Sequence, residues 1–75
     1  MENELRRMSF QTKNKQVIEN TDIYLNSVES FKSDEEILSV LTSNYLEIIK
    51  FEVDKETFYK FRSLVYQIEN QYMDF

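Results

Sequence analysis

Glycine, proline, cysteine, histidine, tryptophan and alanine are all missing from the 75 residues of this chain. Without cysteine, no disulfide can stabilise the fold, and without histidine or cysteine a zinc ion would have to be held by carboxylates alone, which is rare. Without glycine, tight turns that need a positive φ must use residues such as Asn or Asp, so a sheet with several hairpins is disfavoured. The absence of glycine and proline favours long helices instead.

The same absences remove most catalytic chemistry. No Ser-His-Asp triad, Cys-His pair or imidazole base can be built, and there is no glycine-rich loop to hold a phosphate. The acidic run at Glu52, Asp54 and Glu56 is similar to the opening of a calcium loop, but Thr57 and Ser63 stand where such a loop requires Gly and Glu. We therefore expect a protein that is not an enzyme and has no cofactor or metal site.

Length and charge set further limits. A chain of 75 residues forms one domain at most, and its stability is marginal unless its helices pack well or it associates with another chain. The net charge is −5, with four cations against two acids in residues 1–15 and all of the negative excess in residues 16–75. No apolar run approaches the roughly 18 residues of a membrane span, and no signal peptide is apparent. These features predict a cytoplasmic protein without a membrane partner.

A helix near residues 55–73 is the clearest element of the pattern. Asp54 is a good N-cap, and Val53 and Phe58 occupy the two positions of a hydrophobic staple. Apolar residues then recur at spacings of three and four, as on one face of a helix. They are Phe58, Phe61, Val65, Ile68, Tyr72 and Phe75.

A second helix is predicted near residues 34–50, with Ser33 as the N-cap of a capping box. Its apolar arc covers about half of the helical circumference. The arc consists of Ile37, Leu38, Val40, Leu41, Tyr45, Ile48 and Ile49. Asn44 interrupts the arc, either as a buried residue that fixes register or as a half-exposed residue at its edge, and Leu46 falls on the polar side. Residues 49–53 alternate like a short strand, although a frayed helix end is the preferred interpretation.

The remaining helix is predicted near residues 13–31. Its apolar face contains Val17, Thr21, Tyr24, Val28 and Phe31, and Phe10 extends that face backwards. Leu5 and Met8 project away from it, so residues 1–12 are interpreted as an arm or separate helical turn, and residues 13–75 as a single helical domain. A hairpin across residues 10–18 is the alternative. The predicted fold is all-α: a small antiparallel three-helix bundle, with an extra N-terminal helical turn or arm.

Surplus aromatic and acidic surface suggests a binding function. Tyr59, Tyr66 and Met73 form a second stripe beside the core face of the last predicted helix, and aromatic residues and Met are enriched at interface centres. The plainer interpretation is that the tyrosines cover the edges of a thin core. The candidate partner-binding residues are Leu46, Glu47, Glu52, Asp54, Glu56, Tyr59 and Tyr66.

We therefore expect a small acidic interaction module that binds a protein with a basic surface and modulates or inhibits it. Residues with A/T-rich codons (Phe, Tyr, Met, Ile, Asn and Lys) make up 32 of the 75, which suggests a phage or other mobile element of a low-GC bacterium. One alternative is a homo-oligomeric structural protein, with a homodimer formed through the flank of the last helix. Another is a nucleic-acid-associated regulator, using the basic arm or mimicking nucleic acid with its acids, although the net negative charge disfavours nucleic acid as a partner.

Overall fold

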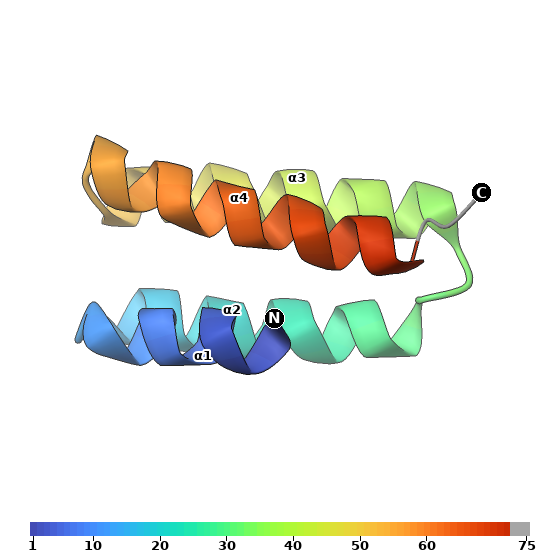
Figure 1. Cartoon of the computed structure of the whole chain (residues 1–75), viewed down its shortest axis with the longest axis horizontal. Helices are drawn as coiled ribbons and strands as arrows, with labels where there is room; N and C mark the ends of the chain where they lie inside the picture. The colour runs from blue at the N-terminus through green and yellow to red at the C-terminus, as the bar shows by residue number, and fades with distance from the viewer. Residues whose placement is uncertain (73–75) are drawn as a thin grey trace.

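The chain forms a closed bundle of four helices in the computed structural model, which describes residues 1–72. The helices are α1 (Glu2–Gln11), α2 (Lys15–Ser30), α3 (Glu35–Glu52) and α4 (Lys55–Tyr72). Consecutive helices run antiparallel, with α1 and α2 in one layer and α3 and α4 in the other, and α4 also packs against α1 (Figure 1). The all-α class is confirmed. The three-helix count is wrong, because the N-terminal residues form a fourth helix.

Residues 1–12 were predicted as an arm or helical turn rather than as a packed helix, because the chain turns sharply before α2. Lys13 has a φ of 55°, in the left-handed region, and this ends the periodicity of α1. The Asn14 side chain then caps α2 by accepting the N–H groups of Gln16 at 2.9 Å and Val17 at 3.3 Å. The helical periodicity of α2 therefore does not continue into α1. Leu5 is fully buried although it does not lie on the apolar face of α2 continued backwards along the chain. The hairpin alternative across residues 10–18 is also wrong.

The other helices begin and end within two residues of the predicted limits over the described part of the chain. The N-cap of α3 is Asp34 rather than Ser33, because the Asp34 carboxylate accepts the Ile37 N–H at 3.1 Å. Asp54 is confirmed as the N-cap residue of α4 by a 2.8 Å hydrogen bond from the Thr57 N–H. The backbone stays helical through Glu52, so the short-strand alternative is wrong. The predicted positions Met73, Asp74 and Phe75 lie outside the described residues.

The core is built from matching positions of α2 and α3. The buried residues of α2 are Val17, Thr21, Tyr24, Leu25 and Val28. Those of α3 are Leu38, Thr42, Tyr45, Leu46 and Ile49, each 21 positions after its counterpart. From α4 come Phe61, Leu64, Val65 and Ile68, and three of these were predicted for the core face. The two central helices therefore bury the same pattern of side chains against each other.

Two tyrosines stack at the centre of the α2–α3 contact. The rings of Tyr24 and Tyr45 have centroids 4.5 Å apart and planes inclined by 15°. Each phenol hydroxyl is hydrogen bonded to a buried threonine of the opposite helix, Tyr45 to Thr21 at 2.7 Å and Tyr24 to Thr42 at 3.1 Å. Burial raises the pKa of Tyr24 to about 12 and raises the pKa of Tyr45 as well. Every buried side-chain polar atom in the described residues has a hydrogen-bond partner.

Several residues predicted for the core face are exposed instead. They are Phe10, Phe31, Val40 and Ile48. On α3 the buried side is centred on Thr42, because α2 and α4 cover that side from two directions. The apolar arc predicted from the sequence is therefore rotated: Val40 and Ile48 face solvent, whereas Leu46, expected to project away from the core, is buried in it.

Candidate functional site: the groove between α3 and α4

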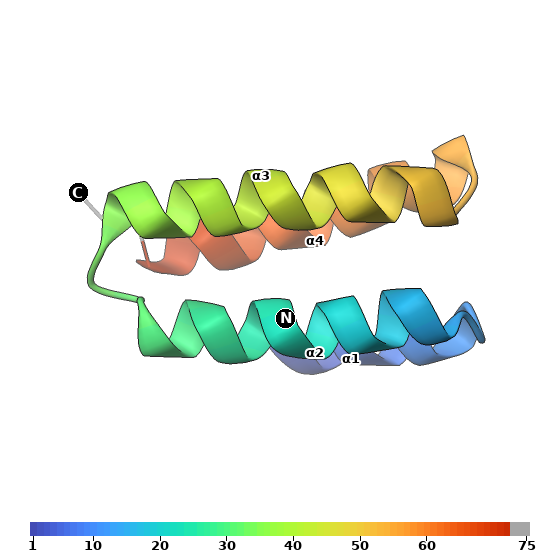
Figure 2. The same ribbon diagram turned by 180° about the vertical axis from the view of Figure 1, so that it is seen from behind.

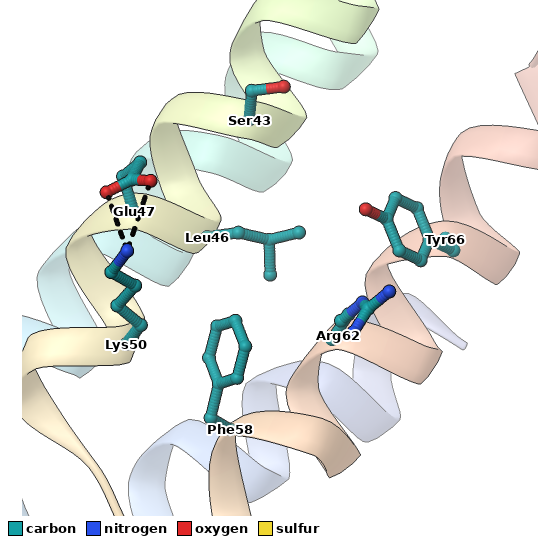
Figure 3. A pocket seen from close by; sticks show the side chains of 7 residues that line it. All are labelled: Ser43, Leu46, Glu47, Lys50, Phe58, Arg62 and Tyr66. Carbon is teal, nitrogen blue, oxygen red and sulfur yellow. Dashed lines mark hydrogen bonds and ion pairs between the residues drawn. The ribbon is translucent and has the colours of Figure 1, made fainter. Parts of the chain in front are cut away.

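Side chains of α3 and α4 leave a groove of about 340 Å³ between them. It is lined by Ser43, Leu46, Glu47, Lys50, Phe58, Arg62 and Tyr66. Leu46 from α3 and Phe58 from α4 extend toward each other across its middle, as Figure 3 shows. Because both side chains also pack against or within the core, the apolar centre of the groove is held by the bundle itself.

Charged groups on the two sides of the groove are already engaged. On α3, the Lys50 ammonium lies 3.4 Å from the Glu47 carboxylate. On α4, the guanidinium of Arg62 lies 5.6 Å from the centroid of the Tyr66 ring, within the range of a cation–π contact. The groove thus combines an apolar floor, one exposed aromatic ring and charges of both signs. This arrangement suits an apolar side chain carried on a polar segment of a partner.

The acids at the α3–α4 junction have structural roles. Glu52 accepts a hydrogen bond from the Asn14 side-chain amide at 3.2 Å, which ties the α1–α2 turn to the end of α3. Asp54 caps α4, and hydrogen bonds from the Thr57 side chain and backbone N–H lower the pKa of its carboxyl. Glu56 is exposed in the first turn of α4, where the helix dipole favours an acid.

Only part of the predicted site comes together. Leu46, Glu47 and Tyr66 line one groove, and exposed Tyr59 lies two helical turns before Tyr66, with the Lys55 ammonium 6.0 Å from its ring centroid. The acids within residues 34–56 do not form one surface, because Asp34, Glu35 and Glu36 lie at the start of α3, whereas Glu52, Asp54 and Glu56 lie at or just beyond its end. Since α3 has 18 residues, these groups lie roughly 25 Å apart.

Two of the groove residues that were missed, Lys50 and Arg62, belong to pairs with helical spacing. Lys50 follows Glu47 by three residues, and Arg62 precedes Tyr66 by four, spacings at which helix side chains meet. Phe58 was assigned to the core stripe, yet it is only half-buried and contributes to the groove as well. The spacing of charged and aromatic residues could have identified both pairs, but not the gap between the two helices.

Residues 1–72 contain no cluster of three or more Asp, Glu, His or Cys side chains that could hold a metal ion.

Among the helices described, none combines the length and the apolar character needed to cross a membrane.

No family model matches this sequence, and searches of curated proteins and of solved structures found no match either.

Proposed function

We propose that this protein is a small interaction module that binds a larger protein through the α3–α4 groove and thereby modulates or inhibits it. The observation that carries the proposal is the groove itself: a 340 Å³ hollow with Leu46 and Phe58 at its centre and an exposed Tyr66 at its edge. A partner side chain placed there would bury apolar surface at the centre, while the polar sides of the groove bound its flanks.

The acidic residues of this chain indicate that the proposed partner has a basic surface. Glu56 is exposed in the first turn of α4, and the chain carries a net charge of −5. A negative field accelerates encounter with a basic surface, whereas aromatic contacts in the groove supply most of the affinity. The proposed partner is therefore a protein with a basic surface that presents an apolar side chain. A phage or mobile-element origin stays a prediction from composition.

Nucleic acid binding has weaker support. Arg6, one of the four cations in residues 1–15, forms an ion pair with Asp22 of α2. That pair uses part of the positive charge that an N-terminal arm would need for phosphate contacts.

Affinity capture from a low-GC bacterial lysate, followed by mass spectrometry and binding kinetics with the captured protein, tests the proposal. Tyr66→Ala should increase the dissociation rate about tenfold or more. Phe31→Ala is the matched control, because both rings are 44% exposed but Phe31 lies at the far end of α2. Glu56→Lys should instead slow association.

The salt dependence of binding separates the electrostatic contribution from that of the aromatic contacts. Between about 50 and 500 mM salt the Debye length shrinks from roughly 14 Å to about 4 Å, so association with a basic partner should slow markedly. If Tyr66→Ala and Phe31→Ala changed the dissociation rate of the captured protein equally, binding at the groove would be contradicted. Binding that is indifferent to salt would contradict the basic partner.

A further inference from the structure

The outer flank of α3 carries an apolar stripe that the bundle covers only in part: Leu41 packs against the core, whereas Ile48 and Phe51 are exposed. Its members alternate at spacings of four and three along the helix, the repeat of a coiled-coil seam. They are Ile37, Leu41, Asn44, Ile48 and Phe51. Phe51 is 79% exposed, and Val40, beside the stripe, is also exposed. Ile37, Leu41 and Ile48 come from the predicted apolar arc, whereas Phe51 lies beyond it.

The neighbouring face of α2 continues the surface without adding charge. At the same spacing of four and three it presents Gln16, Asn20, Ile23, Ser27 and Ser30. Ile23 is 62% exposed and lies with Asn44 at a small dent between the two helices. In a chain with 31% charged residues, the two stripes together contain no charged side chain. We call these two stripes the α2–α3 face.

The α2–α3 face extends along two antiparallel helices and contains a small dent. Figure 2 looks onto it, with α2 and α3 running antiparallel nearest the viewer. The dent between them has a volume of only about 100 Å³, compared with about 340 Å³ for the α3–α4 groove. A dent of this size is too small to bury a ligand, so the face suits an extended contact along the two helices better.

We propose that the α2–α3 face binds a second copy of this chain, forming a two-fold symmetric dimer. The side chains of the two stripes carry no charge of their own, and the Lys50 ammonium lies 5.3 Å from the centroid of the Phe51 ring at one end of the face. Two copies related by a two-fold axis can therefore bring the stripes together without opposing like charges within them. The molecule measures 34 × 19 × 19 Å, so its long face projects roughly 650 Å², close to the roughly 800 Å² per partner of a stable interface.

Asn44 gives such a dimer a means of fixing its register. It lies between Leu41 and Ile48 in the apolar stripe, at a seam position where a single polar residue specifies alignment at some cost in stability. The groove lies on the other flank of α3, around Leu46 and Lys50. A dimer through the α2–α3 face would therefore leave two grooves open, and the protein would be bivalent toward its target.

Sedimentation equilibrium of the full chain and three variants tests the dimer. Ile23→Lys places a cation in the face and should raise the dimer dissociation constant about tenfold or more. Phe10→Lys is the matched control: it makes the same charge change at a side chain of similar exposure, 59%, on α1. Asn44→Leu removes the polar seam residue and should tighten the dimer. Circular dichroism checks that each variant is folded.

Salt gives an independent readout. Each copy carries a net charge of −5, so screening should strengthen the dimer between about 50 and 500 mM salt, whereas it should weaken binding of a basic partner in the α3–α4 groove. A parent chain that stays monomeric up to about 1 mM would overturn the proposal, and so would a dimer that Ile23→Lys weakens no more than Phe10→Lys does. A monomeric parent whose captured partner is lost with Ile23→Lys and kept with Tyr66→Ala would assign the face to another protein.

Discussion

Removing the hydroxyl of Tyr45 should test how the bundle centre is held together. In Tyr45→Phe the ring keeps its stack on Tyr24, but the fully buried Thr21 hydroxyl loses its 2.7 Å partner. Leaving a buried hydroxyl without a partner costs about 1–3 kcal/mol. Thr21 can turn its hydroxyl toward the carbonyl one helical turn back, so we expect a loss of free energy of unfolding near the lower end of that range.

A double variant measures the energy of the hydrogen bond between the two side chains. Thr21→Val with Tyr45→Phe removes both partners and keeps nearly the same shape, so it should be less destabilising than the sum of the single substitutions. The difference, the coupling energy, should be about 1 kcal/mol. The reciprocal cycle at Thr42 and Tyr24 should give a smaller coupling energy, because that hydrogen bond is longer, at 3.1 Å.

Urea unfolding followed by circular dichroism measures each free energy, provided that the slope with denaturant is unchanged among the variants. Loss of helix signal at the same midpoint for all four proteins of the first cycle would show that the hydrogen bond contributes nothing. A coupling energy within about 0.3 kcal/mol of zero would refute the reasoning, since the two groups would then behave as independent sites.

Replacing the N-cap of α3 in Asp34→Ala should cost about 1 kcal/mol in urea melts, whereas Ser33→Ala should cost less than about 0.5 kcal/mol because its side chain caps nothing in the structure; the reverse order would restore Ser33 as the cap. Leu5→Ala should destabilise by about 2–5 kcal/mol, because Leu5 is fully buried; an unchanged melting temperature would remove α1 from the core. Stability should stay level up to pH about 9 and fall as the pH rises from about 10 toward 12, because the pKa of Tyr24 is about 12 when folded and near 10 when unfolded, so the unfolded state releases the proton first. Tyr24→Phe should reduce that fall in pH-dependent urea melts, and an identical pH profile for the variant would contradict it.

The sequence pattern was sufficient for α2, α3 and α4 because each has a long periodic face, and the capping residues before α3 and α4 locate their starts to within one residue. It was insufficient for α1, since periodicity is informative only within one helix and the turn at Lys13 resets it. Nothing local indicates that a Lys occupies a left-handed position, where glycine is the usual residue. The ten residues of α1 were also too few for their own pattern to be decisive.

Which side of α3 is buried could not be read from its composition. The helix has apolar residues around more than half of its circumference, and the presence of α4 and α2 on either side decides which of them are covered. Leu46 is buried because two helices meet over it, and Val40 is exposed because none does. Tertiary packing also limits what the sequence indicates about the candidate site. Tyr66 and Glu47 were identified as surface residues, but the groove that joins them depends on the packing of α4 against α3.

Because α1 is short, we expect it to detach before the rest of the bundle unfolds. A helix of ten residues is too short to persist alone in water, so α1 exists only while it is docked on α2 and α4. Its far end is joined to the rest of the chain by the 2.7 Å hydrogen bond from the Tyr72 hydroxyl to Glu2. Amide hydrogens of α1 should therefore exchange with solvent through partial opening, while those at the α2–α3 centre exchange only when the whole domain unfolds. Each detachment of α1 would bare the side of the core that Leu5 covers.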